Sequence, residues 1–173
     1  PRFTMEILDQ NDQLIDPMCG KADFSSANAV QLGLAGGWHD ATSGGAPTTS
    51  SNIIYKDWTP VGLNVSTYHG QRIKVRLTTF DCGQSAHFGY AYFNLGCTKA
   101  RITSSSCGAG ATVSTLSAPP GFNYRWYSLD APNVTLSTDD HLQVSGSGSY
   151  GCWVSYNLSG SSCGFAMSTA SGP

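Results

Sequence analysis

The sequence predicts an all-β protein built from two β-sandwich modules, and three observations lead to this prediction. Gly, Ser and Thr are abundant, while charged residues make up only 12% of the 173 residues. That composition is typical of extracellular β-proteins with many turns. Short segments that alternate apolar and polar residues recur between turn residues, as half-buried strands do. Hardly any stretch carries apolar residues at helical spacing.

The first module is expected to be jelly-roll-like and to cover residues 1–99. Residues 2–8 alternate, and a turn at 10–12 follows, which predicts a hairpin at the start of the chain. Residues 25–52 lack periodicity and are rich in Gly, Ser, Ala and Thr, so we expect a long loop there. Residues 53–58 again predict a strand.

The centre of this module is predicted to be a long hairpin. Residues 73–80 alternate as a strand, 83–86 are turn material, and 88–95 carry apolar residues on both faces. A place in the sandwich core is the alternative to a surface platform for Trp58, Tyr90 and Tyr92, and it is favoured for the residues that lie on a strand.

The second module, residues 100–173, is expected to be Ig-like, because short strands alternate with turns at the spacing of that fold. Trp126 matches the core tryptophan of strand C, and Tyr150, two residues before Cys152, matches the tyrosine-corner position. The expected strands are B (111–117), C (122–129), E (142–144), F (from 150) and G (164–169).

Six cysteines without a C-x-x-C pair predict disulfides and an oxidising compartment rather than a zinc site. A link between Cys82 and Cys97 is not expected, because a turn at 83–86 leaves Cys97 ten residues, at roughly 3.3 Å each, from the position opposite Cys82. Cys19 is therefore expected to pair with Cys82, at the same end of the first sandwich. In the second module, Cys107 with Cys152 is one pairing, because strands B and F run parallel there.

Three stretches of the chain resemble a known family. They read DCGQSAHFGYAYFNLGC, PRFTMEILDQNDQLIDPMCGKADF and CGAGATVSTLSAPPGFNYRWYS. The first two are similar to the jelly-roll modules, and the third to the Ig-like modules, of very large gliding-motility and adhesin-type surface proteins of Bacteroidota that the type IX secretion system exports. The resemblance implies secretion to the cell surface. It also implies a Cys107 to Cys163 disulfide, so the pairing in the second module stays open.

Several function classes are not expected. The formal net charge is −2 and no basic run exists, which argues against nucleic acid as a partner. No apolar stretch approaches the roughly 20 residues of a membrane span, so direct membrane insertion is not expected. Asp81, His87 and the many serines lack a G-x-S-x-G elbow, and the adjacent Asp139 and Asp140 do not suit a glycosidase, so the chain is not expected to be an enzyme.

Ligand binding is the remaining function that the residues themselves suggest. Aromatic and imidazole side chains in or next to loops could stack on sugars and bond their hydroxyl groups. These candidates are Trp38, His39, Trp58, Tyr68 and His69. No cofactor is required, with calcium kept as an alternative on oxygen-ligand type alone. The calcium candidates are Asp9, Asp57, Asp81 and Asn94, with Asp16 and Asp23 as further carboxylates. Asn94 stands where related modules carry Asp, which weakens that alternative.

The sequence and the resemblance together predict a non-catalytic pair of modules from a secreted, cell-surface adhesin or filament protein, acting as spacer and ligand-binding head. The alternative is a carbohydrate-binding module of a secreted glycan-degrading enzyme. The expected partners are neighbouring modules of the same long chain and surface glycans or another cell's surface. Because Pro1 leads directly into a strand pattern, we expect a piece of a longer chain, with the first module truncated on its N-terminal side.

Overall fold

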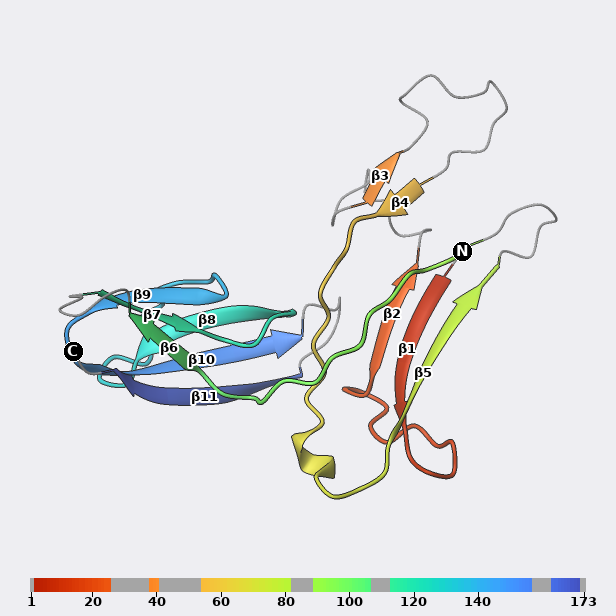
Figure 1. Ribbon diagram of the computed structural model, residues 1–173, viewed down its shortest axis with the longest axis horizontal. Coiled ribbons are helices and arrows are strands. Elements are labelled where there is room, and N and C mark those ends of the chain that lie inside the picture. Colours follow the sequence, from red (N-terminus) through yellow and green to blue (C-terminus); the bar gives the residue numbers. More distant parts are fainter. Residues whose placement is uncertain are drawn as a thin grey trace. The chain divides into compact units, whose positions relative to one another are not determined.

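A computed structural model describes residues 2–25, 38–40, 54–81, 89–106, 113–156 and 163–171 (Figure 1). The described residues form strands and one short 3-10 helix, which confirms the predicted all-β fold. None of the helical residues among them forms a segment long and apolar enough to cross a membrane.

The chain divides into two compact units that are not contiguous in sequence. Unit 1 combines Pro1–Thr59 with Arg72–Asn94, and unit 2 combines Pro60–Gln71 with Leu95–Pro173. The sequence predicts a single boundary between residues 99 and 100, whereas in the structure the segment 60–71 groups with the later residues.

Unit 1 is organised around a three-stranded antiparallel sheet. Its middle strand β1 (Arg2–Leu8) pairs with β2 (Lys21–Ser25) on one side and with β5 (Lys74–Phe80) on the other. The alternation of β1 directs Ile7 to the same face as Ala22, and both are buried. The first strand and the strand at 73–80 are therefore predicted correctly.

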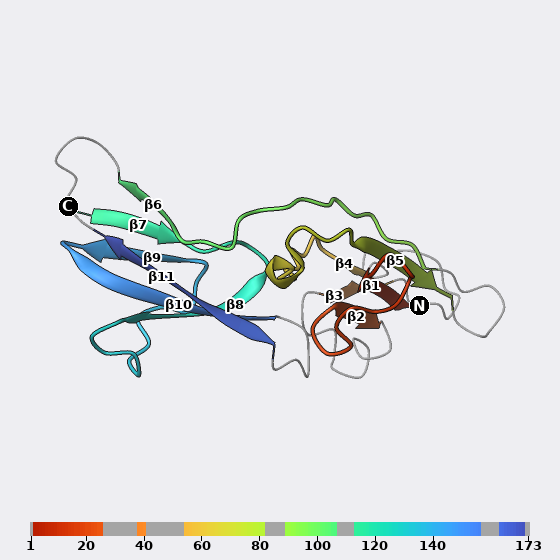
Figure 2. The same cartoon turned by 90° about the horizontal axis from the view of Figure 1, so that it is seen from below.

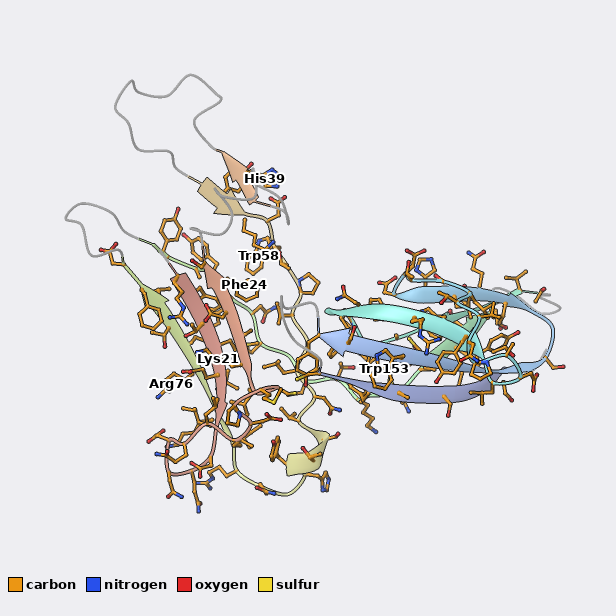
Figure 3. The ribbon with its side chains drawn as sticks, turned by 180° about the vertical axis from the view of Figure 1, so that it is seen from behind. Lys21, Phe24, His39, Trp58, Arg76 and Trp153 are labelled. Carbon is orange, nitrogen blue, oxygen red and sulfur yellow. The ribbon has the colours of Figure 1, made fainter. Side chains whose placement is uncertain are left out.

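The opposite face of this sheet carries a charged ladder. Arg2 pairs with Asp23, and the carboxylate of Glu6 lies 3.9 Å from Lys21 Nζ and 2.9 Å from Arg76 Nη2. Figure 3 labels Lys21 and Arg76 on the two outer strands. Opposite charges on neighbouring strands favour this register over a shifted one. The Arg2–Asp23 pair is exposed and adds little stability, whereas the Glu6 side chain is only 16% exposed.

A two-stranded antiparallel sheet, β3 (Trp38–Asp40) with β4 (Ile54–Lys56), forms the rest of the described part of unit 1. Trp38 therefore lies on a strand, where the sequence predicts a loop. Ser25, His39 and Asp40 of the predicted loop also lie on strands, and its other residues lie outside the described residues. A jelly roll needs more strands than β1 to β5, so that topology stays a prediction for unit 1.

The predicted second strand of the central hairpin is wrong over the part that is described. Residues 89–99 contain no strand, and β5 takes β1 as its neighbour instead. Gly89 and Ala91 explain the difference, because residues with so little side chain have low strand propensity and contribute little packing to a sheet.

The core interpretation of three aromatic residues is also wrong. Trp58 is 74% exposed, Tyr90 73% and Tyr92 80%. The rings of Tyr90 and Tyr92 meet edge to face with centroids 5.7 Å apart. Burial was expected for Tyr90 and Tyr92 because they alternate as residues on one face of a strand do. No strand forms there, and both side chains stay exposed.

Unit 2 is a sandwich of two three-stranded sheets with Ig-like strand order. One sheet runs β6-β7-β9 and the other β11-β10-β8, which corresponds to A-B-E and G-F-C (Figure 2). The strands are β6 (Thr103–Ser106), β7 (Val113–Ser117), β8 (Phe122–Ser128), β9 (His141–Ser145), β10 (Gly148–Tyr156) and β11 (Gly164–Ser171). The predicted strands B, C, E, F and G are confirmed wherever the structure describes them.

Trp126 lies at the centre of this sandwich, as predicted. It is fully buried between residues of both sheets, including Leu116 of β7 and Val154 of β10, and its indole N–H donates to the Asp139 carbonyl at 2.8 Å. In a tyrosine corner, the tyrosine hydroxyl donates to a backbone carbonyl a few residues upstream. A bond of this kind is made by a different residue from the one expected. Tyr124, rather than Tyr150, donates its hydroxyl to the Pro119 carbonyl at 2.9 Å.

The segment 60–71 is fixed to this sandwich by backbone contacts. The Gly62 N–H donates to the Gly121 carbonyl at 2.9 Å, and the Asn64 N–H donates to the Tyr156 hydroxyl at 2.7 Å. A 3-10 turn, η2 (Ser66–Tyr68), follows. These bonds explain why this segment belongs to unit 2 although it precedes β5 of unit 1 in sequence.

The cysteines differ in state. Cys19 and Cys163 each take part in a disulfide, while Cys97 and Cys152 are free thiols. The Cys107 to Cys152 pairing is therefore wrong. Cys152 is buried in the core, and the buried residue of β7 is Leu116, so strand B offers no cysteine at that depth.

The reason given for pairing Cys19 with Cys82 is also wrong, although Cys82 itself lies outside the described residues. Cys19 lies just before β2, near the end of β1 at which Glu6 pairs with Lys21. The strand β5 ends at Phe80, which pairs with Arg2 at the other end of β1. Those two ends of β1 are four residues, or about 13 Å, apart. The free Cys97 agrees with the prediction that it does not pair with Cys82.

The free thiols give a first testable expectation. Burial raises the pKa of Cys152 to about 11, so on the order of one thiol in a thousand is ionised at pH 8. Iodoacetamide at pH 8 should modify the exposed Cys97 of the native protein and leave Cys152 unmodified until denaturant is added. Peptide mass spectrometry reads both sites at once. Equal rates at the two sites in the native protein would show that Cys152 is not in the core.

Candidate ligand-binding site

The described part of unit 1 carries an exposed group of aromatic and polar side chains on and after the β3-β4 pair. We call it the β3-β4 cluster: His39, Tyr55, Asp57 and Trp58. His39 is the direct cross-strand partner of Tyr55, and their rings stack with centroids 5.1 Å apart and planes 26° apart. Cross-strand pairing on one face of a two-stranded sheet places the two rings together.

The polar part of the β3-β4 cluster begins where β4 ends. His39 Nε2 lies 2.8 Å from Asp57 Oδ2, with the imidazole 44% and the carboxylate 69% exposed. The Thr59 hydroxyl donates to the Asp57 carbonyl at 2.9 Å, which holds the chain after β4 in a local turn. Asp57 therefore orients the imidazole, and the imidazole lies flat against Tyr55.

Trp58 follows Asp57 directly and is 74% exposed. Figure 3 labels it together with His39, on the segment that leaves β4. A large aromatic ring left this open to water gains little from the fold itself. The β3-β4 cluster thus offers the Tyr55 ring against an imidazole that a carboxylate holds, with the exposed indole of Trp58 on the residue that follows Asp57. This combination suits a ligand that has both an apolar face and hydroxyl groups.

The structure divides the other predicted ligand-binding residues. Tyr68 ends η2 and His69 follows it, and both belong to unit 2, whereas His39 and Trp58 belong to unit 1. Trp38 lies on β3 opposite Lys56, but its side chain is outside the described part of the chain. Of the predicted set, only His39 and Trp58 are placed in the β3-β4 cluster.

The predicted calcium ligands are largely used in other ways. The Asp9 carboxylate accepts the backbone N–H groups of Gln13 at 2.9 Å and Asn11 at 2.8 Å. The bond from Gln13 is the largest cause that lowers the pKa of Asp9. Asp57 binds His39 as described. The described residues contain no group of three His, Cys, Asp or Glu side chains placed to hold a metal ion.

The remaining carboxylates and Asn94 give no further support to calcium. Asp16 accepts the N–H groups of Met18 and Cys19, each at 2.9 Å, and closes the turn before β2. The hydrogen bond from Arg2 is the largest cause that lowers the pKa of Asp23. Asp81 follows β5, and Asn94 lies in the segment without strand. Calcium binding stays a prediction without a described site.

Sequence reasoning missed Tyr55 as a ligand-binding residue and gave Asp57 a different role. The signal was present in Tyr55-Lys56-Asp57, because Tyr55 and Asp57 are two positions apart on a predicted strand and therefore lie on the same face of it. What the sequence does not contain is the register that sets His39 opposite Tyr55. Without it, the three side chains have no reason to be grouped.

Comparison with known proteins adds nothing to this geometry: no family model, no curated protein and no solved structure matches the chain.

Proposed function

We propose that this chain is a non-catalytic binding pair of β-sandwich units from a large secreted, cell-surface adhesin or filament protein. The observation that supports this proposal is the β3-β4 cluster, in which the Tyr55 ring lies against an imidazole that Asp57 orients and the exposed Trp58 follows directly in the chain. In this proposal unit 1 carries the ligand-binding head, and unit 2 acts as the spacer that links it to neighbouring modules.

The chemistry of the β3-β4 cluster favours a neutral sugar. The apolar face of a pyranose packs on the ring of a tryptophan or tyrosine, while its hydroxyl groups need both donors and acceptors. Asp57 supplies acceptors, and the His39 imidazole supplies a donor or an acceptor according to its tautomer. The disulfide-bonded state of Cys19 and Cys163 supports an oxidising, extracellular location.

The second candidate is a carbohydrate-binding module of a secreted glycan-degrading enzyme, and the same cluster favours it. Both candidates bind glycans without catalysis by this chain. They differ in what flanks the two units in the full-length gene: repeated modules support the adhesin, and a hydrolase domain supports the enzyme-attached module.

Glycan-array binding of the fragment tests the shared part of the proposal. We expect binding to at least one neutral glycan class, and we expect Trp58→Ala and Tyr55→Ala each to weaken it by about tenfold or more, the equivalent of about 1.4 kcal/mol. His39→Ala should weaken it less, because it removes a polar contact and one stacking partner.

Tyr92→Ala is the control, since Tyr92 is an exposed tyrosine of unit 1 outside the β3-β4 cluster. It should leave glycan binding unchanged. A fragment that binds no glycan, or one whose binding falls as much in Tyr92→Ala as in Trp58→Ala, would contradict the proposal.

A further inference from the structure

The outer surface of the sheet β8-β10-β11 in unit 2 carries two large rings and a single charge. Alternation along β10 directs Cys152 and Val154 into the core, so Trp153 between them points outward, where it is 40% exposed. Across the strand pairing, Trp153 lies opposite Arg125, and Gly151 lies opposite Tyr127. We call these side chains, Trp153, Arg125 and Tyr127, the β10 outer face; Figure 3 labels Trp153.

Glycines on the neighbouring positions allow both rings to lie against the sheet. A Cβ atom added to Gly151 would overlap the ring of Tyr127, and one added to Gly164 would lie 3.0 Å from Cζ2 of Trp153. One side of each ring therefore covers a glycine, and the other side is directed away from the sheet. Both rings therefore lie flat against the sheet and do not project from it.

Arg125 completes this surface and is held in position. Its guanidinium carbon lies 4.9 Å from the centroid of the Tyr127 ring, and its Nη1 donates to the Pro132 carbonyl at 2.9 Å. These contacts use one N–H group and one face of the guanidinium. Within the described part of the chain, no other hydrogen bond of this guanidinium is found, which leaves N–H groups for a ligand.

No carboxylate neutralises Arg125 within the described part of the chain. The three strands of its sheet, β8, β10 and β11, contain no Asp or Glu, and Arg125 is the only charged residue on them. Asp130, in the turn that also carries Pro132, forms no ion pair with it among the described contacts. A positive charge beside two rings, without a carboxylate of its own, is complementary to a ligand that brings one.

We propose that the β10 outer face binds a carboxylate-bearing sugar, a uronic or sialic acid unit of a glycan. The sugar ring stacks on Trp153, and its carboxylate accepts hydrogen bonds from the Arg125 guanidinium. A lone cation is too little charge for a phosphate backbone, whereas small polar side chains around the rings suit sugar hydroxyl groups. They are Asn123, Ser155 and Ser168. This site is separate from the β3-β4 cluster and does not rest on the function proposed for it.

Isothermal titration calorimetry with two acidic probes tests the proposal and distinguishes the two sources of the carboxylate. The probes are tri-galacturonic acid and 3′-sialyllactose, with lactose as the neutral counterpart. At least one acidic probe should bind and lactose should bind at least about tenfold more weakly. Trp153→Ala should weaken acidic binding about tenfold or more. Arg125→Gln should weaken it to a similar extent and abolish its dependence on salt, because the ion pair is what salt screens.

Two further variants make the outcome independent of folding and of the other site. Ala166 lies opposite Trp153 on β11 and is exposed, so Ala166→Glu adds a repelling charge without touching the core and should reduce acidic binding several-fold. Tyr55→Ala, in the β3-β4 cluster, should leave acidic binding unchanged. The proposal is overturned if neither acidic probe binds, if binding survives Trp153→Ala and Arg125→Gln, or if Trp153→Ala instead dissolves a dimer seen by analytical ultracentrifugation.

Discussion

Replacing Trp126 by alanine is expected to lower the free energy of unfolding of unit 2 by about 3 to 5 kcal/mol. The indole is fully buried between the two sheets, where it contacts side chains of β7, β9, β10 and β11. Its removal leaves a cavity in the centre of the core and leaves the Asp139 carbonyl without its 2.8 Å donor. Chemical denaturation followed by circular dichroism measures the loss.

Trp126→Phe is the control for this change. It keeps much of the ring volume but removes the indole N–H, so we expect a smaller loss of about 1 to 3 kcal/mol. A Trp126→Ala protein that unfolds within about 1 kcal/mol of the wild type would mean that the sandwich does not close around this residue.

Gly121→Ala is expected to be the most destabilising change outside the core. Gly121 has a φ of +96°, and an added Cβ would lie 2.6 Å from the Gly62 nitrogen and 2.9 Å from the Val61 carbonyl carbon. The backbone conformation alone costs a non-glycine residue about 1 to 3 kcal/mol. The overlap adds to this cost, because the atoms it meets are backbone and the Gly62 N–H must stay within reach of the Gly121 carbonyl.

Gly146→Ala separates the two contributions. Gly146 has a similar φ of +84°, but nothing lies within 4 Å of its added Cβ. We expect about 1 to 2 kcal/mol for Gly146→Ala and clearly more for Gly121→Ala, with faster hydrogen exchange at the Gly62 and Asn64 amides only in the latter. Equal losses, with no change at those amides, would show that 60–71 is not fixed to unit 2.

Unit 2 could be predicted strand by strand because its signals are local. The strands β7 to β11 alternate, turn residues separate them, and Trp126 marks the core position of β8. The exposed strand β6, Thr-Ser-Ser-Ser, has no such pattern and was not predicted. Unit 1 could not be predicted to the same extent. The alternation around Tyr90 and Tyr92 depends on which strand lies beside β5, and that pairing is not local.

The two candidate sites were only partly visible in the sequence for the same reason. His39 and Trp58 were found by residue type next to predicted loops, whereas their association with Tyr55 depends on strand register. The β10 outer face was missed altogether. Its rings pack against Gly151 and Gly164 on neighbouring strands. The sequence alone does not show which aromatic ring packs against a glycine in a strand.

The central claim is that surface aromatic residues of this chain bind a glycan without participation of its core. The side-chain indole N–H signals of the four tryptophans in a ¹H–¹⁵N spectrum test it directly, once Trp58→Phe and Trp126→Phe have assigned two of them. Titration with the best neutral glycan from the array should shift the Trp58 signal progressively to saturation. The Trp126 signal should stay in place, because that indole is buried and bonded to Asp139. A bound glycan that leaves Trp58 unchanged, or that shifts Trp126 as far, would contradict the claim.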